Sequence, residues 1–268
     1  MLRPRRPPRL RGLSLNRMIP NILTMGALCA GMTAIRYGLD GRWRAAVVAV
    51  LIAAILDGLD GRIARLLKGA SKFGAELDSL SDFISFGVAP AVLLYFWTMN
   101  KAGDIGWPLV LLYAVCCALR LARFNTMLGG ADLPPFAYNF FTGVPAPAAA
   151  GLVLLPLVGS FQFPETKFFS GPVLSGVMLV GVSALMVSRI PTFSGKGIRV
   201  PHNYVAPVLL MTGVLAAFLV ATPWLTILFI GIIYLLAIPV SIRAFRKLER
   251  AAAEMHESVG VEPDSGTL

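Results

Sequence analysis

Asp57-Gly-Leu-Asp60-Gly61-Arg-Ile-Ala64-Arg65 is followed after eight residues by Gly74-Ala-Glu-Leu-Asp78-Ser-Leu-Ser-Asp82, and long apolar runs flank the pair. At helical spacing, Asp57 and Asp60 share a stripe with Gly61 and Ala64. Gly74, Asp78 and Asp82 recur every fourth residue and therefore line one face of a second helix. If the two faces meet, four carboxylates share one pocket and repel one another. Divalent cations with a preference for oxygen ligands, such as Mg²⁺, Mn²⁺ or Ca²⁺, would relieve that repulsion.

The composition indicates a membrane protein. Of the 268 residues, 56% are hydrophobic and 14% are charged, and the mean hydropathy is +0.73. These values exclude an ordinary soluble globule. Because a span needs roughly 20 apolar residues, we expect an all-α polytopic bundle of about eight transmembrane helices. They cover residues 19–34, 45–56 with an extension to 67, 80–99, 106–124, 143–161, 172–190, 204–221 and 224–242.

Lysine and arginine are distributed unevenly over the expected loops. With both termini cytoplasmic, Arg36, Arg42, Arg44, Lys101 and Lys167 fall outside, and the other 19 of the 24 fall inside. The positive-inside rule therefore predicts a multi-pass protein of the inner (cytoplasmic) membrane with the aspartates at the cytoplasmic side. The net charge of +10 fits contact with membrane lipids. No folded nucleic-acid module is visible, so we expect no nucleic-acid partner.

The chain is expected to hold one membrane domain between two short ends. Residues 1–17 form a basic segment that is partly disordered or interfacial. Residues 18–250 form the transmembrane domain, and 251–268 form a disordered cytoplasmic tail. Cys29, Cys116 and Cys117 fall within expected spans without metal-binding spacing, which favours a packing role.

The aspartate stretch, written D-x-x-D-G-x-x-A-R-x8-G-x3-D-x3-D, resembles the motif of the CDP-alcohol phosphatidyltransferases, and every fixed position is filled. A chance acidic cluster at a helix end is disfavoured by so complete a match. The resemblance implies a six-helix core in which the motif joins two helix ends and binds a CDP-linked lipid through two divalent cations, Mg²⁺ or Mn²⁺. It implies Asp57, Asp60, Asp78 and Asp82 as metal ligands, with Asp82 also as the catalytic general base.

Neighbouring motif residues are expected to bind the CDP-lipid. Gly61 and Ala64 leave room for the nucleotide beside the helix, and Gly74 allows close approach. Arg65 can direct its guanidinium to phosphate or instead balance the carboxylates.

Pro20-Asn21-Ile-Leu-Thr24 is expected to open the first helix, with Asn21 and Thr24 on one face. On its own, this pattern also fits a helix start with a small-residue packing face. The family resemblance favours a place for Asn21 and Thr24 beside the nucleotide.

Three further segments narrow the resemblance: Arg120-Leu-Ala-Arg123-Phe-Asn125, Phe141-Thr-Gly143-Val-Pro145-Ala-Pro147-Ala-Ala, and Ser188-Arg189-Ile-Pro191. Together they look like the bacterial members that use L-serine. This implies transfer of the phosphatidyl group of CDP-diacylglycerol to serine with release of CMP, by a homodimer.

An arginine within a span is costly unless it meets an anion. Arg120, Arg123 and Arg189 are therefore candidates for the serine carboxylate, and Asn125 for a polar contact. Arg123 can alternatively extend to the interface.

Two alternatives remain at the level of sequence. Another acceptor, such as glycerol phosphate, inositol phosphate or choline, would suit the same arginines. An ion-coupled transporter would also carry intramembrane acids, although its acids are expected at mid-membrane rather than at one edge.

Overall fold

The computed structural model describes residues 15–67, 71–127, 140–188, 190–193 and 204–258. The first half contains α1 (Leu15–Leu39), α2 (Trp43–Leu66), α3 (Lys72–Asp82), a π-helical segment (Phe83–Val88), α4 (Ala89–Trp97), a 3₁₀ segment (Met99–Ile105) and α5 (Gly106–Met127). The second half contains β1 (Phe140–Thr142), α6 (Ala146–Val153), α7 (Leu155–Gln162), α8 (Lys167–Ser170), α9 (Pro172–Val187), β2 (Pro191–Phe193), α10 (Val205–Ala221) and α11 (Pro223–Ser258).

The predicted polytopic helical bundle is confirmed. Within the described residues, four helical stretches are long and apolar enough to cross a membrane: Met18–Leu39, Lys72–Trp97, Met99–Thr126 and Pro223–Arg243. α9 and α10 are shorter apolar helices. α2 is equally long but carries the charges of the motif in its last turns. Each of the eight predicted segments contains helix.

Three boundaries differ from the sequence-based expectation. The first helix begins at Leu15, so Pro20 lies inside it rather than at its start; the φ of proline is helical, and only one backbone hydrogen bond is lost. The expected fifth span is divided at Leu154 into α6 and α7, next to Pro156. At the other end, α11 continues to Ser258, past the expected boundary at 250. Alanine, glutamate and methionine in residues 251–258 are good helix formers.

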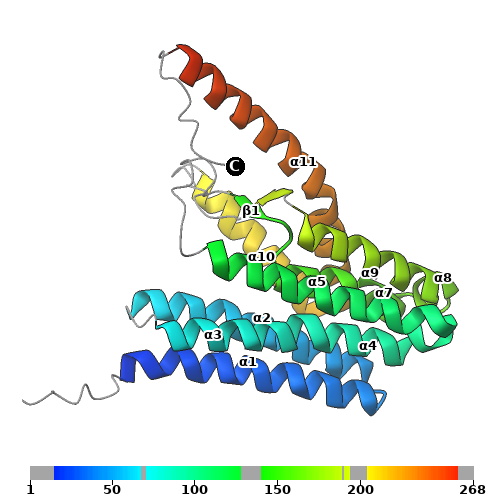
Figure 1. The fold of residues 1–268 in the computed structure, drawn as a ribbon. Coiled ribbons are helices and arrows are strands. Elements are labelled where there is room, and N and C mark those ends of the chain that lie inside the picture. Colours follow the sequence, from blue (N-terminus) through cyan, green and yellow to red (C-terminus); the bar gives the residue numbers. More distant parts are fainter. Residues whose placement is uncertain (1–14, 68–70, 128–139, 189, 194–203, 259–268) are drawn as a thin grey trace, which may run out of the picture.

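α1 is the central element around the motif. It packs along α2 and also contacts α3, the π-helical segment and α4; Figure 1 shows α1 along the bottom of the bundle. A Cβ on Gly31 would lie 2.5 Å from Ser85 Oγ and 2.8 Å from Ser85 Cα, so only glycine permits this approach. The hydroxyls of Ser81 and Ser85 donate to the carbonyl oxygens of Thr24 and Ala27, at 3.1 and 3.2 Å. The helix that carries Asp78 and Asp82 is thus held against α1.

The π-helical segment begins directly after Asp82 and has an identifiable cause. Pro90 has no N–H, so the carbonyl of Phe86, four residues earlier, lacks its α-helical donor. The hydroxyl of Tyr113 on α5 donates to this carbonyl at 2.8 Å, and Tyr113 is completely buried. α5 is therefore fastened to the third span just beyond the motif.

β1 and β2 join two of the segments that carried the family resemblance. They pair antiparallel, with Phe140 opposite Phe193 and Thr142 opposite Pro191. Gly143 follows with φ 76°, and a Cβ there would lie 2.7 Å from the carbonyl oxygen of Met186. Its N–H donates to the carbonyl of Ile190 at 2.8 Å. The turn into α6 therefore needs glycine and is tied to the end of α9.

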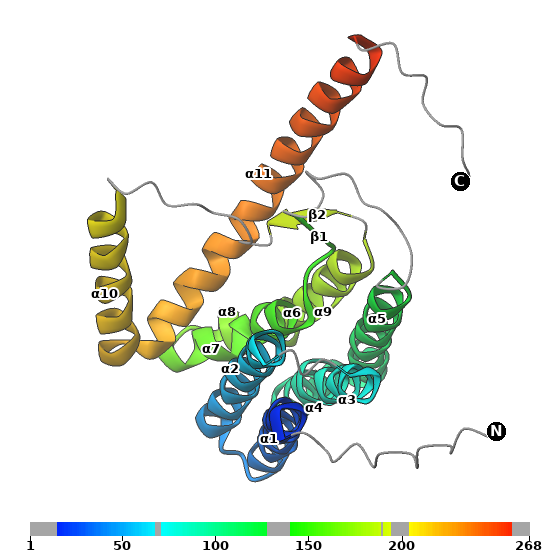
Figure 2. The same ribbon diagram turned by 90° about the vertical axis from the view of Figure 1, so that its left-hand side faces the viewer.

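α10 lies outside the remaining helices, and Figure 2 shows it standing apart at the left. α10 has no buried residue and packs against α11. α11 packs against α7, with Thr226, Leu228 and Ile238 buried.

Candidate functional site

Three aspartates from two helices form one cluster. Asp57 and Asp60 lie in the last turns of α2, and Asp78 lies on α3. Each contributes one carboxylate oxygen to a set in which all atoms lie within 4.8 Å of one another. Asp60 is 4% exposed, and the other two are partly buried. Water screens charges poorly at such a site, so the negative charges repel strongly unless a cation or protons offset them.

Asp82 lies beside this cluster. It follows Asp78 by one turn on α3, and its carboxyl group is within hydrogen-bonding reach of that of Asp57. It does not belong to the 4.8 Å set of the other three. The structure thus brings all four predicted aspartates together but separates Asp82 from the tightest group.

The donor set fits a hard divalent cation. All three clustered ligand atoms are carboxylate oxygens, which Mg²⁺ and Mn²⁺ prefer. Asp78 Oδ1 is buried, and among the described residues it has no hydrogen-bond partner. A buried carboxylate oxygen without a donor is costly, and a cation would satisfy it.

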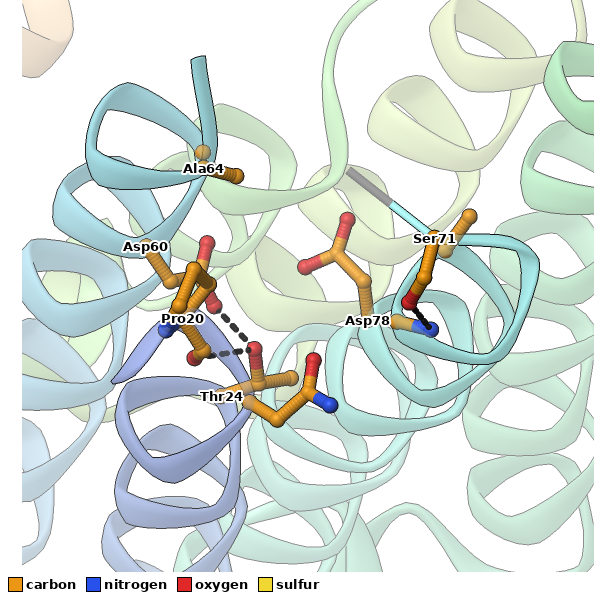
Figure 3. Close-up of a pocket in the computed structure, with 10 residues that line it drawn as sticks. Pro20, Thr24, Asp60, Ala64, Ser71 and Asp78 are labelled. Atoms are coloured by element: carbon orange, nitrogen blue, oxygen red, sulfur yellow. Dashed lines mark hydrogen bonds between the residues drawn. The ribbon is translucent and has the colours of Figure 1, made fainter. Parts of the chain in front are cut away.

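The first helix orients one of these aspartates. The hydroxyl of Thr24 lies 2.5 Å from Asp60 Oδ2 and 3.1 Å from the carbonyl oxygen of Pro20. Figure 3 shows both contacts, with Asp78 facing Asp60 across the pocket. Thr24 is 4% exposed, so this hydrogen bond is shielded from water.

A pocket of about 160 Å³ opens beside Asp60 and Asp78 (Figure 3). It is lined by Pro20, Asn21, Thr24, Asp60, Gly61, Ala64, Ser71, Gly74, Ala75 and Asp78. Five of the six residues expected to bind the CDP-lipid lie in this lining: Asn21, Thr24, Gly61, Ala64 and Gly74. Sequence reasoning missed Pro20, Ser71 and Ala75.

Ser71 had a recognisable signal. Its hydroxyl accepts a hydrogen bond of 3.0 Å from the N–H of Gly74, which makes Ser71 the N-cap of α3. Serine three residues before the start of a helical stripe is a common capping pattern. Pro20 and Ala75 carry no comparable signal, because each is a small apolar residue within a helix.

The two motif glycines serve different purposes. A Cβ on Gly61 would meet no atom of the described chain within 4 Å, so its missing side chain leaves space open to the pocket. A Cβ on Gly74 would lie 2.9 Å from Asn21 Oδ1. Gly74 therefore lets α3 approach α1, whereas Gly61 keeps the pocket wide.

Arg65, the sixth predicted CDP-lipid residue, is not among the residues that line the pocket. It is exposed, and its Nε donates to the carbonyl of Gly61 at 3.0 Å.

Arg120 on α5 belongs to the aspartate site. It is 9% exposed, and it lies near enough to Asp57 and Asp82 for direct electrostatic interaction. Its guanidinium lies 6.0 Å from the Phe124 ring, and within the described chain Nε has no hydrogen-bond partner. A buried guanidinium nitrogen without an acceptor fits an anion beside the aspartates.

The other acceptor candidates have different surroundings. Arg123 donates to the carbonyl oxygens of Met186, Val187 and Ser188, at 3.4, 2.8 and 3.1 Å, and so caps the end of α9. Asn125 Nδ2 donates to Ser79 Oγ at 2.9 Å, next to Asp78. Arg189 lies outside the described residues.

The chain is similar to known proteins over most of its length. The CDP-alcohol phosphatidyltransferase profile matches residues 17–243. A CDP-diacylglycerol–serine O-phosphatidyltransferase of Mycobacterium tuberculosis is 43% identical over 243 residues, covering 91% of this chain and 84% of the relative. A protein of the same name from Helicobacter pylori is 40% identical over 181 residues, covering 66% and 73%. An archaetidylserine synthase of Methanothermobacter thermautotrophicus is 37% identical over 186 residues, covering 67% and 72%. With its motif assembled at one site and matched over nearly the whole membrane region, the chain belongs to the CDP-alcohol phosphatidyltransferase family.

Proposed function

We propose that this protein transfers the phosphatidyl group of CDP-diacylglycerol to the hydroxyl of L-serine, giving phosphatidylserine and CMP. The observation that carries the proposal is the cluster of Asp57, Asp60 and Asp78 beside a pocket lined by small motif residues. The choice of serine is supported by the names of relatives that are 40–43% identical.

The pocket favours a nucleotide diphosphate next to the carboxylates. Gly61 and Ala64 present little bulk on the α2 side, and Asn21 offers an amide on the α1 side. Members of this family generally depend on divalent metals. Two divalent cations, Mg²⁺ or Mn²⁺, held by Asp57, Asp60, Asp78 and Asp82 would neutralise the diphosphate and stabilise the CMP leaving group.

Asp82 is the proposed general base. Its carboxylate accepts the proton of the serine hydroxyl while that oxygen forms a bond to the lipid-side phosphorus, and the bond from this phosphorus to the CMP oxygen breaks. The position of Asp82 outside the tight group supports this role, because a base must keep an oxygen free for the acceptor. Arg120 is the proposed partner of the serine carboxylate, since its buried guanidinium lies close enough to Asp82 and to Tyr234 of α11 for electrostatic interaction.

The orientation and assembly of the protein are further parts of the proposal. The excess of Lys and Arg in the loops on the motif side supports an active site that faces the cytoplasm from the inner membrane. We also propose a homodimer, on the family resemblance alone.

The test is an acceptor panel with the purified full-length chain in detergent micelles. CDP-diacylglycerol is supplied with L-serine, glycerol phosphate, inositol phosphate or choline, and released CMP is measured. We expect CMP release with serine and Mg²⁺ or Mn²⁺, phosphatidylserine as the lipid product, and no reaction in EDTA. Faster release with another acceptor would overturn the choice of serine. Full turnover after verified metal removal would overturn the role of the cations.

A further inference from the structure

The α1–α2 turn forms a second site at the end of the bundle opposite to the aspartates. The aspartates Asp57 and Asp60 lie near the end of α2, whereas the turn that precedes α2 carries Arg42, and Arg44 lies in the first turn of α2. Figure 1 shows this turn at the right-hand end of the α1–α2 pair. It is thus about 20 Å from the motif, at 1.5 Å per helical residue.

Aromatic side chains at this end of the bundle are typical of a membrane–water interface. The rings of Phe161 and Trp224 pack edge to face with centroids 4.8 Å apart. Trp43 and Tyr37 pack partly buried against the core. Tryptophan and tyrosine gather at the level of lipid headgroups, where one side of the ring is apolar and the other is wet.

Two adjoining cavities meet at Arg44. The first, of about 510 Å³, is lined by Arg42, Trp43, Arg44 and Phe161 with their neighbours. The second, of about 420 Å³, runs between α1 and α2 and is lined by Ala30, Val48, Ala49 and Ile52 as well as Tyr37 and Arg44. Arg44 and Ala45 line both cavities. A basic chamber therefore leads into an apolar groove that extends toward the middle of the membrane.

The two guanidinium groups have donors available for an anion. Arg42 lies over the Tyr37 ring at 4.7 Å, and Arg44 lies over the Phe161 ring at 5.7 Å. In the described part of the chain, the two guanidinium groups contact these rings and form no ion pair with a carboxylate. A guanidinium whose partner is a ring face keeps N–H donors for other acceptors, and these donors match the oxygens of a phosphate.

We infer that this site binds an anionic phospholipid, with the headgroup phosphate between Arg42 and Arg44 and one acyl chain in the α1–α2 groove. Charge complementarity selects the headgroup, and the apolar lining selects a lipid over a free phosphate ion. The bound lipid is a structural ligand at the outer end of the bundle and is distinct from the CDP-lipid at the aspartates.

The inference is tested by native mass spectrometry of the delipidated full-length protein, titrated with phosphatidylglycerol or with phosphatidylcholine of the same acyl chains. Each arginine near a membrane surface adds to the binding free energy of an anionic lipid. R42Q combined with R44Q should therefore weaken phosphatidylglycerol binding roughly thirtyfold. Phosphatidylcholine should bind the unaltered protein more weakly than phosphatidylglycerol does. The matched control is R36Q combined with K101Q, which removes two charges from the same end of the bundle outside both cavities. This control should bind phosphatidylglycerol like the unaltered chain.

A second pair of variants tests the groove. Val48 is 43% exposed and lines the groove, so V48W should fill it and weaken phosphatidylglycerol binding without burying new bulk in the core. Met32 is 53% exposed on α1 outside this lining, and M32W should leave binding unchanged.

Three results would overturn the inference. The first is equal affinity of the protein for phosphatidylglycerol and phosphatidylcholine. The second is an equal loss of phosphatidylglycerol binding in the double arginine variant and in its charge control. The third is displacement of the lipid by inorganic phosphate together with unchanged phosphatidylglycerol binding by V48W. The last result would identify the chamber as a site for free phosphate.

Discussion

The hydroxyl of Thr24 on α1 lies 2.5 Å from Asp60 Oδ2 on α2, in a buried position. A threonine outside the aspartate motif thus orients one of the expected metal ligands. The same helix holds α3 through the carbonyl of Thr24, which accepts from Ser81. α1 therefore sets both the direction of Asp60 and the distance between the two helices that carry the aspartates.

Replacing Thr24 by alanine should weaken the metal site. Loss of the hydrogen bond frees the Asp60 side chain, and partners that orient a metal ligand are typically worth about 10–100-fold in metal affinity or activity. We expect the Mg²⁺ concentration for half-maximal CMP release to rise by about that range, and T24S to restore most of it. T212A on α10 removes a hydroxyl with the same kind of i−4 hydrogen bond, far from the motif, and should have no effect. An equal loss in T24A and T24S would show that only packing matters at this position.

Replacing Gly61 by valine should block CDP-diacylglycerol while the protein still folds. No atom of the described chain lies within 4 Å of a Cβ at Gly61, so the new side chain occupies the pocket rather than the core. We expect a much higher KM for CDP-diacylglycerol and an unchanged Tm. Gly58, on the same helix, is equally unobstructed but does not line the pocket, and G58V is the matched control. If G58V and G61V are equally impaired, the effect comes from β-branching in α2 and not from the pocket.

Substitutions of Asp82 and Asp78 should have different effects on turnover and on metal binding. D82N keeps the size of the side chain but cannot accept the serine proton, so kcat should fall by about 100-fold or more. Binding of Mn²⁺, followed by its paramagnetic resonance signal, should fall less in D82N than in D78N, because Asp78 belongs to the tight group and Asp82 does not. Near-normal turnover of D82N would remove Asp82 from the role of base.

Much of the site could be predicted from the sequence because its spacing is helical. The intervals of three and four residues among Asp57, Asp60, Asp78 and Asp82 place each pair on one helix face, and the family motif adds that the two faces meet. The contact between Thr24 and Asp60 was not predicted, because no local rule links residues 36 positions apart. The resemblance placed Thr24 only beside the nucleotide.

The remaining features depend on tertiary packing. In the sequence, Arg123 was a candidate for the serine carboxylate with the membrane interface as its alternative, yet it caps α9, whose end lies far away along the chain. The π-helical segment before Pro90 was not predicted, and the donor that compensates for the missing N–H of Pro90, Tyr113, lies on the next helix. The end of α11 was misplaced because a polar, acidic composition was read as disorder, although its alanines favour helix.

Removing the hydroxyl of Tyr113 should destabilise the third span. Y113F leaves the Phe86 carbonyl without a donor in a fully buried position, which costs roughly 1–3 kcal/mol in the free energy of unfolding. A lower Tm in detergent is expected, with a smaller change for Y95F, because Tyr95 contacts Phe96 and Trp107 through its ring. Equal Tm values for the two variants would mean that water replaces the lost donor.

Arg120 and Arg123 should differ in what their loss affects, although both lie on α5 one turn apart. Arg120 is buried beside Asp57 and Asp82, so R120Q should raise the KM for serine far more than the KM for CDP-diacylglycerol. R120K should rescue only partly, since an ammonium lacks the planar pair of donors that a carboxylate accepts.

Arg123 instead donates to three carbonyls at the end of α9, so R123Q should lower the free energy of unfolding by roughly 1–2 kcal/mol while the serine KM changes little. Both KM values and the Tm of each variant are measured in the same detergent. An equal rise of both KM values in R120Q would place this guanidinium on the diphosphate. A serine-specific defect in R123Q with an unchanged Tm would reverse the two assignments.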